Sequence, residues 1–521
     1  MEITSAGVVG LGTMGAGIVE VFARAGLAVT AVEVNDELLS AGRERLTSSL
    51  GRAVDRGRLA AEERDAIIER VAFTTAREQL AAVDLVVEAV PERLDIKTAL
   101  LRDLDGICPA ETVLATNTSS LPVTELAAAT ARPGRVIGMH FFNPAPVMRL
   151  VEVIRTVTTD GDVLAAVRSL AERCGKTPVV VGDRAGFVAN ALLFGYLNDA
   201  AHAAETGQAA IADLDAAVVA ATGFPMGPLT LLDLIGLDVS LDVLHTLFDE
   251  TRDPRYAPAP LLRRLVMAGW LGRKTGRGYY AYDDSPPVPA IETPAPQASA
   301  PRSITRVAGV GGARKSDLLA AFEPVVVSAD EVAGADVVLI DGGSLTATTE
   351  LAARVAGRLG EEAVIAVATS DEAPVAVVAA ATGRPADVVG VHLPLVPRRG
   401  VVEVVMTART DAGAAATAAA AATAAGLTPV VCRDRPGRLL DALLLPHLND
   451  AVRMVGDGYA TRDDVDAAMT LGCGYPEGPM AMLAAVGADE LRSRLLHLAA
   501  ATHVAALAPA PLLDDLAAFG G

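Results

Sequence analysis

The sequence contains an internal repeat, and this repeat restricts the possible folds more than any other feature. Four motifs of the first half recur in the second half at a constant offset of 251 residues. A constant offset maintained over such a distance indicates a duplicated structural unit rather than chance similarity. The pairs are GKTPVVVGDRAGF at Gly175 and GLTPVVCRDRPGR at Gly426, LNDA at Leu197 and Leu448, GFPMGP at Gly223 and GYPEGP at Gly474, and APAPLL at Ala257 and Ala508.

Within each copy, the pattern of apolar residues predicts two kinds of domain. In the first half, β-rich runs alternate with helical stretches up to about Asp183, which indicates a doubly wound, Rossmann-type parallel sheet covered by helices on both faces. From Asp183 onward the pattern is helical almost throughout, as in an all-α domain. We therefore expect a Rossmann-type domain at 1–182, a helical domain at 183–283, a Pro- and Ala-rich linker at 284–302, a degenerate Rossmann-like domain at 303–433 and a second helical domain at 434–521.

Composition narrows the possible partners and compartment. The formal net charge of −20 opposes binding to nucleic acid, because a polyphosphate would be repelled. The 4 cysteines are far apart and show no metal-ligand spacing, so we expect neither a disulfide framework nor a metal site. No basic leader precedes an apolar block at the start, and no apolar run is long enough to span a membrane. These features predict a soluble, cytoplasmic protein without a membrane partner.

A glycine motif near the start predicts a dinucleotide site. Gly10-Leu11-Gly12-Thr13-Met14-Gly15 follows an apolar strand and opens a helix at about Thr13. The first glycine permits a tight turn, the second admits the pyrophosphate, and the third lets helix and strand pack closely. Glu33 ends the next strand, where its carboxylate can bind an adenosine ribose and repel a 2′-phosphate, so NAD is favoured over NADP. The second half has Ala313 and Ser316 in place of Gly12 and Gly15, and we expect no dinucleotide there.

Six ordered motifs over residues 1–283 resemble those of the short-chain L-3-hydroxyacyl-CoA dehydrogenases. They are GLGTMGAGI, EAVPER, TNTSSLPV, GMHFFNPAPVMRLVEVI, GFVANALL and LGRKTGRGYYAY. The resemblance implies NAD-dependent oxidation of a 3-hydroxyacyl-CoA, such as the short-chain 3-hydroxybutyryl-CoA of fatty-acid β-oxidation. It also implies that the helical domain mediates dimerisation and that the acyl-CoA binds in the cleft between the domains. The complete chain would be a tandem form with a degenerate second unit.

The expected chemistry requires a general base, and His140 is the candidate. Oxidation of an alcohol needs a group that takes the hydroxyl proton while hydride leaves carbon, and histidine has a suitable pKa. Glu152 resembles the family's partner residue, which fixes the imidazole tautomer. The resemblance further implies that Ser119 and Asn190 hold the reacting oxygen. For an isolated histidine, a role in the core would be the better interpretation, but the flanking motifs favour catalysis.

The remaining site residues follow from the resemblance. Asn117 and Asn143 would support the loops that aim Ser119 and His140. Glu92 and Lys97 match positions that line the nicotinamide ribose, although a solvated helix start explains them nearly as well. The acidic nucleotide of CoA needs cations, and the stretch after Leu50 offers arginines where the family commonly has lysines. An ordinary charged helix surface is an equal alternative for these arginines, which are Arg52, Arg56 and Arg58.

The duplicate retains a histidine and a glutamate, His392 and Glu403, but not their companions. Asp441 stands in the place of Asn190, and Ala368 in the place of Asn117. An acid beside a developing alkoxide disfavours the transition state, so we predict a chemically silent second site. The second helical domain could pair with the first inside one chain as a pseudo-dimer, or the chains could form a homodimer.

Three other functions are compatible with the sequence. Long two-unit members of the family include 3-hydroxyadipyl-CoA dehydrogenases of aromatic-acid catabolism, whose dicarboxylic substrate needs an additional cation in the pocket. A sugar-acid dehydrogenase with the same catalytic residues would have no use for the arginines after Leu50. Outside enzymes, the chain could be a non-catalytic protein that binds NAD or a CoA ester. Acyl chain length, terminal charge and direction of flux are not readable from the sequence.

Overall fold

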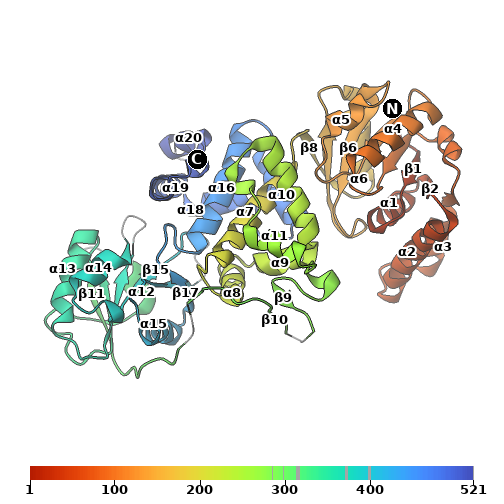
Figure 1. The fold of residues 1–521 in the computed structure, drawn as a ribbon. Helices are drawn as coiled ribbons and strands as arrows, with labels where there is room; N and C mark the ends of the chain where they lie inside the picture. Colours follow the sequence, from red (N-terminus) through yellow and green to blue (C-terminus); the bar gives the residue numbers. More distant parts are fainter. Residues whose placement is uncertain (284–285, 297–298, 312–316, 370–373, 397–399, 520–521) are drawn as a thin grey trace. The chain divides into compact units, whose positions relative to one another are not determined.

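The computed structural model describes residues 1–521 except 284–285, 297–298, 312–316, 370–373, 397–399 and 520–521 (Figure 1). The predicted linker, 284–302, therefore lies partly outside the described residues. The chain forms two compact units. One unit consists of Met1–Ala191, Asp249–Thr251 and Asp457–Gly478, and the other of Leu192–Phe248, Arg252–Gly456 and Pro479–Gly521.

The first unit is built on one sheet of the doubly wound type. Its strand order is β3-β2-β1-β4-β5-β6-β7-β8, and neighbouring strands are parallel except for the antiparallel pair β6 and β7. Each strand is short and rich in Val, Leu and Ile, as expected for a sheet that is buried on both faces. The strands are β1 (Ser5–Val9), β2 (Ala28–Val32), β3 (Val71–Thr74), β4 (Leu85–Glu88), β5 (Val113–Thr116), β6 (Val136–Phe141), β7 (Leu150–Arg155) and β8 (Thr177–Gly182).

Helices bury both faces of this sheet. One core cluster joins apolar side chains of α1, α2, α3 and α6 to the sheet, and a second joins those of α4 and α5 to its other face. The first helix starts at Thr13, as predicted from the glycine motif. The helices are α1 (Thr13–Arg24), α2 (Asp36–Asp55), α3 (Ala61–Glu69), α4 (Leu94–Ile107), α5 (Val123–Ala128) and α6 (Gly161–Arg173). The segment Asp457–Gly478, which belongs to the same unit, contributes α17 (Arg462–Gly472).

The second unit contains a smaller sheet of the same kind. Its order is β12-β11-β13-β14-β15-β16-β17, with only β15 and β16 antiparallel. No strand stands in the position of β3 among the described residues, and the predicted remnant of the glycine turn, with Ala313 and Ser316, lies outside them. The strands are β11 (Val307–Gly311), β12 (Val325–Val326), β13 (Val337–Asp341), β14 (Val364–Ala368), β15 (Val388–His392), β16 (Val401–Met406) and β17 (Thr428–Arg433).

In the described part of the second repeat, short and medium-length helices alternate with the strands of this sheet. The alanine-rich stretch near 411–426 forms a helix, α15. Its buried alanines pack on strand residues such as Val402 and Val404. The predicted duplicated architecture, a Rossmann-type sheet followed by helices, is therefore confirmed. The helices are α12 (Asp317–Phe322), α13 (Leu345–Ala356), α14 (Val375–Ala381) and α15 (Ala412–Ala424).

The helical regions of both repeats supply the rest of the second unit. From the first repeat come α7 (Ala189–Glu205), α8 (Ile211–Thr222), α9 (Pro228–Ile235), α10 (Leu237–Thr251), α11 (Pro260–Met267) and the hairpin of β9 (Tyr280–Ala281) and β10 (Val288–Pro289). From the second come α16 (Leu440–Gly456), α18 (Pro479–Val486), α19 (Ala488–Thr502) and α20 (Pro511–Phe519).

Equivalent helices of the two repeats, α7 and α16, lie against each other. The rings of Tyr196 and His447 are 5.6 Å apart, and His447 Nδ1 lies 3.3 Å from the carbonyl oxygen of Leu192. Asp199 and Asp450 occupy the same position in the two copies of the LNDA motif. Both bind the guanidinium group of Arg255, at 2.6 and 2.5 Å respectively. One arginine thus joins the two repeats.

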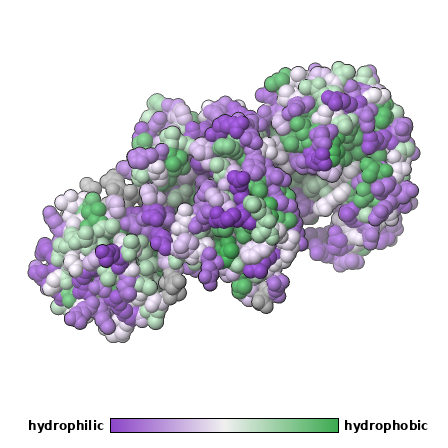
Figure 2. All heavy atoms as spheres, in the orientation of Figure 1, coloured by the Kyte–Doolittle hydropathy of each residue, from purple (hydrophilic) through white to green (hydrophobic). Residues whose placement is uncertain are grey.

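The surface is mixed in character. Figure 2 shows hydrophilic residues over the face in view, with hydrophobic residues in small separate groups. The large exposed apolar side chains, such as Val157, Met267 and Phe519, are far apart in the sequence. No helix in the described part of the chain has both the length and the apolar character needed to cross a membrane.

Candidate active site

The glycine motif forms the tight turn that a dinucleotide requires. Gly10 has a φ of 91°, and a Cβ atom there would lie 2.8 Å from the carbonyl oxygen of Ala89. A Cβ atom on Gly15 would overlap the carbonyl group of Gly10, so α1 can pack closely on the turn only with glycine at this position. At Gly12 no atom lies within 4 Å of an added Cβ, which leaves the backbone open to a ligand. The turn therefore fits the pyrophosphate of NAD.

The acid at the end of β2 lies at this turn. One carboxylate oxygen of Glu33 accepts a hydrogen bond from the Leu11 N–H at 2.6 Å, and the other accepts one from the Val34 N–H at 3.0 Å. Two backbone bonds leave a carboxylate with further acceptor sites for ribose hydroxyls. Thr13 and Met14 open α1 between Gly12 and Gly15, where the first N–H groups of a helix lack intrahelical partners and can bind a phosphate.

A charge network with a buried pair, Lys97 and Glu88, and a partly exposed carboxylate, Glu92, lies at the carboxyl ends of β4 and β5. Lys97, only 1% exposed, places its ammonium 2.9 Å from both oxygens of Glu88 and 3.2 Å from Glu92. Glu92 in turn accepts hydrogen bonds from the hydroxyl of Thr118 and the N–H of Ser119, at 2.6 and 2.8 Å. Burial opposes ionisation of Glu92, but Lys97 and these bonds hold the pKa of its carboxyl below the ordinary value. The cofactor roles of Glu92 and Lys97 stay predictions.

The histidine and glutamate of the first half face each other across two strands. His140 of β6 and Glu152 of β7 are direct partners in the antiparallel register. His140 Nδ1 lies 2.7 Å from one oxygen of Glu152, and the other oxygen accepts the N–H groups of Val188 and Ala189, both at 3.0 Å. Glu152 is fully buried. The carboxylate is therefore fixed, and it leaves Nε2 as the ring nitrogen for a substrate.

The neutral polar residues predicted from the resemblance lie next to this pair. Asn190 follows Ala189 at the start of α7, and its amide donates to the carbonyl oxygen of Ser119 at 3.2 Å. The Ser119 hydroxyl lies 3.3 Å from Glu92. Asn117 accepts the N–H of Phe141 at 2.9 Å and so ties the ends of β5 and β6 together. Contacts thus run continuously from the histidine pair through Asn190 and Ser119 to Glu92.

These groups share one edge of the sheet with the glycine turn. Three strand steps separate β1 from β6, which corresponds to about 14 Å at the usual spacing between strands. Ligands of doubly wound sheets bind at the carboxyl ends of the strands. A dinucleotide on the turn would therefore extend along the edge toward His140.

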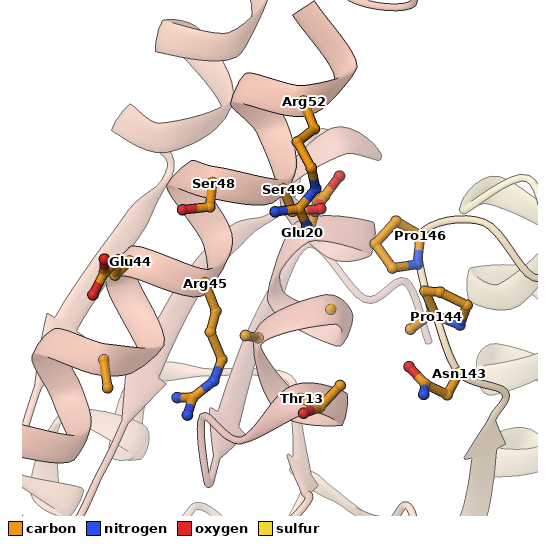
Figure 3. Close-up of a pocket in the computed structure, with 14 residues that line it drawn as sticks. Thr13, Glu20, Glu44, Arg45, Ser48, Ser49, Arg52, Asn143, Pro144 and Pro146 are labelled. Atoms are coloured by element: carbon orange, nitrogen blue, oxygen red, sulfur yellow. The ribbon is translucent and has the colours of Figure 1, made fainter. Parts of the chain in front are cut away.

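A surface pocket lies between α1, α2 and the loop after β6 (Figure 3). It measures about 500 Å³, and Arg52 and Asn143 are among its lining residues. Arg56 is the C-cap of α2 and Arg58 lies beyond it, and neither residue lines this pocket. The lining also includes Arg45, which was not singled out from the sequence. The signal was present, because Arg45, Ser48, Ser49 and Arg52 are spaced as neighbours on one helix face.

In the second repeat, His392 and Glu403 keep the strand register of the first repeat's pair but make different side-chain contacts. His392 and Glu403 are again direct partners across β15 and β16. However, His392 Nε2 lies 3.1 Å from Asp441 and 3.8 Å from Glu403, while Nδ1 lies 3.5 Å from the carbonyl oxygen of Thr369. Arg494 binds the same Asp441 oxygen at 2.6 Å. The ring nitrogen that would face a substrate is therefore engaged by an acid, which supports the prediction of a silent site.

Glu403 offers a pH-dependent test of this buried cluster. Burial, with a smaller effect of Asp441, raises the pKa of Glu403 to about 7 although His392 opposes the shift. The native state then holds a proton that the unfolded chain releases, so the stability contributed at this site falls as pH rises from about 4.5 to 7. Glu403→Gln keeps an acceptor for the N–H groups of Leu439 and Leu440. The free energy of unfolding of Glu403→Gln minus that of wild type should therefore increase by about 2–3 kcal/mol from pH 5 to pH 8, because only wild type loses stability as Glu403 ionises.

Urea unfolding at both pH values measures this difference. The matched control is Glu172→Gln, which removes a carboxylate that is 53% exposed. Its effect should stay within about 0.5 kcal/mol at both pH values. A Glu403→Gln effect independent of pH would contradict the raised pKa.

Comparisons with known proteins show which family the chain belongs to. The model of the 3-hydroxyacyl-CoA dehydrogenase NAD binding domain matches residues 5–184 and 321–435, and that of the C-terminal domain matches 186–282 and 437–521. A 3-hydroxyadipyl-CoA dehydrogenase of Escherichia coli is 34% identical over 94% of this chain and 92% of its own length. A 3-hydroxybutyryl-CoA dehydrogenase of Mycobacterium tuberculosis is 47% identical over 54% of this chain and 99% of its own.

A solved structure titled 3-hydroxybutyryl-CoA dehydrogenase from Escherichia coli superimposes with a TM-score of 0.79 and 32% identity, covering 99% of both chains. The sheet, the glycine turn and these matches define an NAD-dependent oxidoreductase. The chain belongs to the 3-hydroxyacyl-CoA dehydrogenase family. The prediction of this family, and of NAD as the cofactor, is confirmed.

Proposed function

We propose that the chain oxidises a short-chain 3-hydroxyacyl-CoA, such as 3-hydroxybutyryl-CoA, with His140 as the general base. This proposal is carried by the 2.7 Å contact between His140 Nδ1 and Glu152. With Nδ1 donating to the carboxylate, Nε2 takes the proton of the substrate hydroxyl, and Glu152 stabilises the imidazolium that forms. When bound, NAD supplies the acceptor for the hydride that leaves the same carbon. In the reverse reaction the imidazolium returns its proton to the carbonyl oxygen.

Ser119 and Asn190 orient the reacting oxygen in this proposal. Their mutual contact and the bonds from Glu92 hold both residues beside the histidine pair. Neutral donors placed before the reaction stabilise the charge that develops on oxygen without reorganisation. Asn117 and Asn143 hold the strand ends and the loop after β6.

The pocket in Figure 3 is proposed to hold the CoA nucleotide. The side chains of Arg45 and Arg52 come from α2 and line the pocket together with Asn143, Pro144 and Pro146 of the loop after β6, and in the view of Figure 3 Arg52 ends beside Glu20. Guanidinium groups bind phosphate through paired hydrogen bonds. Arg56 and Arg58, beyond the pocket lining, would act through longer-range attraction.

A 3-hydroxyadipyl-CoA dehydrogenase is the second candidate. It is favoured by the full-length similarity to the relative of that name, since the single-repeat relatives match only the first half. The short-chain substrate is favoured by the 47% identity between the first half, which carries the histidine pair, and a 3-hydroxybutyryl-CoA dehydrogenase.

Initial rates of NADH oxidation test the proposal. Acetoacetyl-CoA should be reduced faster than 3-oxoadipyl-CoA, and free acetoacetate should be reduced far more slowly than its CoA ester. Faster reduction of 3-oxoadipyl-CoA would select the second candidate. No turnover with any 3-oxoacyl-CoA would leave a protein that only binds NAD or CoA esters.

We also propose that the helical regions pair inside one chain as a pseudo-dimer. The contacts of α7 with α16, and the arginine shared by Asp199 and Asp450, support this arrangement. The second repeat then takes the place of a partner subunit. Sedimentation velocity tests it: a strictly monomeric species supports internal pairing, whereas a dimer leaves both arrangements open.

A further inference from the structure

Helix α17 of the second repeat packs against the strand that carries Glu152 of the first repeat's histidine pair. It contacts β7, which bears Glu152, and β8 at the edge of the sheet. The segment Asp457–Gly478 belongs to the same compact unit as residues Met1–Ala191. A part of the second repeat is therefore a structural component of the first repeat's site.

Polar contacts anchor this segment at the end of β8. The Tyr459 hydroxyl donates to the carbonyl oxygen of Gly182 at 2.8 Å. The guanidinium group of Arg184 lies 4.5 Å from the centre of the Tyr459 ring and 3.4 Å from Asp457. Hydrogen bond and cation–π contact fix the start of the segment relative to β8.

The last residue of α17 reaches the surroundings of His140. A Cβ atom on Gly472 would lie 2.6 Å from Leu150 Cδ2 and 3.1 Å from Phe142 Cε1. The ring of Phe142 is 4.5 Å from the ring of His140, and Leu150 begins the strand that carries Glu152. Because glycine has no side chain, the helix end lies directly against the two residues that flank the catalytic pair.

The Glu152 carboxylate also affects the pKa of two side chains in this segment. Burial, reinforced by Glu152, raises the pKa of the Cys473 thiol to about 12 and also raises the pKa of Tyr459. Both groups are therefore close enough to Glu152 for its negative charge to disfavour their ionisation.

The equivalent contact in the second unit, made by a helix of the first repeat on the second repeat's sheet, has a different residue at the position of Gly472. There α8 of the first repeat packs on β16 and β17, and Gln208, the counterpart of Tyr459, donates to the carbonyl oxygen of Arg433 at 3.2 Å. The counterpart of Gly472 is Ala221. The residue that faces the first repeat's histidine pair is thus a glycine, whereas the equivalent residue that faces the second repeat is an alanine.

We propose that the second repeat completes the first repeat's active site, with Gly472 and Tyr459 as positioning residues for His140 and Glu152. This inference rests on the proposed dehydrogenase function. It gives a physical reason for retaining a second repeat whose own histidine is engaged by Asp441. Phe142 and Leu150 transmit the position of α17 to the catalytic pair.

Substitution of Gly472 in the full chain tests the inference. Gly472→Ala should lower kcat roughly 10-fold and Gly472→Leu further, since a 1 Å misplacement can cost about 100-fold. The KM for NADH should change less than twofold, because the glycine turn is formed by other strands. The matched control is Gly106→Ala at the end of α4, where no atom lies within 4 Å of an added Cβ, and its kcat should stay at the wild-type value.

A pH profile and a second position separate positioning from general stability. In Gly472→Ala the alkaline limb of the kcat profile for acetoacetyl-CoA reduction should move, because this direction needs the protonated ring of His140 and the His140–Glu152 contact is loosened, whereas Gly106→Ala should leave it in place. Tyr459→Phe keeps the ring under Arg184 and should retain most of the kcat that Tyr459→Ala loses. Melting temperatures establish that the compared variants are folded.

The outcomes distinguish this inference from the proposed function. A wild-type protein without turnover of any 3-oxoacyl-CoA would overturn both. Normal wild-type turnover, together with unchanged kcat and pH profile in folded Gly472→Ala, would overturn only the role of the second repeat.

Discussion

Replacing His140 by Ala is expected to lower kcat for the reduction of acetoacetyl-CoA by about 10²- to 10⁴-fold, the usual contribution of a general acid–base group. The side chain is 6% exposed, and its Nδ1 is held by Glu152 at 2.7 Å. Among the contacts described for His140 and Glu152, no other group can transfer the substrate proton in place of His140 Nε2. Initial rates at saturating NADH measure the effect.

The duplicate supplies a matched control for this experiment. His392→Ala removes the equivalent side chain of the second repeat, where Nε2 is bound to Asp441, and should change kcat less than twofold. Binding of NADH, followed by fluorescence, should be unchanged in both variants, because the glycine turn lies on other strands. Loss of turnover in His392→Ala, with His140→Ala active, would reverse the assignment of the two sites.

The largest expected effect on stability comes from Arg255. This side chain is 7% exposed and is the cation shared by Asp199 and Asp450. Burial raises the pKa of both carboxyls, and Arg255 opposes that rise. Arg255→Met leaves two carboxyl groups without their cation, and it should lower the free energy of unfolding by about 3–5 kcal/mol. Because domains are stable by only about 5–15 kcal/mol, urea unfolding should show a large shift.

Two further variants test the cause of that loss. Arg264→Ala removes an arginine that is 61% exposed and pairs with Glu205, and it should cost less than about 1 kcal/mol. Adding Asp199→Asn and Asp450→Asn to Arg255→Met removes the unpaired charges and should recover most of the stability. A loss without recovery would assign the effect to packing of the arginine side chain instead.

The sequence predicted local structure and repeated structure well. The glycine motif predicted the turn and the start of α1, because positive φ and close backbone approach admit only glycine at Gly10 and Gly15. Alternating apolar runs predicted the sheet, and the constant offset predicted its second copy. The separation of His140 and Glu152 could be read from the sequence, but their direct pairing follows from the antiparallel register of β6 and β7.

Other parts of the site could not be predicted in this way. Arg45 reaches the pocket because α2 turns one face toward the loop after β6, and Lys97 is buried because Glu88 and Glu92 surround it. The ring of His392 turns toward Asp441, which is 49 residues away. Such contacts depend on how whole elements pack, which a local pattern of residue types does not record.

By itself, the sequence determined that a nucleotide-binding unit was copied, and that only the first copy kept the glycines, the acid and the polar companions of its histidine. Only the tertiary structure decided that α17 of the second copy lies against β7 and β8 of the first copy, and that Arg255 joins the two helical regions. The physical reason is that turns and strands are set by neighbouring residues. Burial, shared charges and packing are set by residues that meet only after the chain has folded.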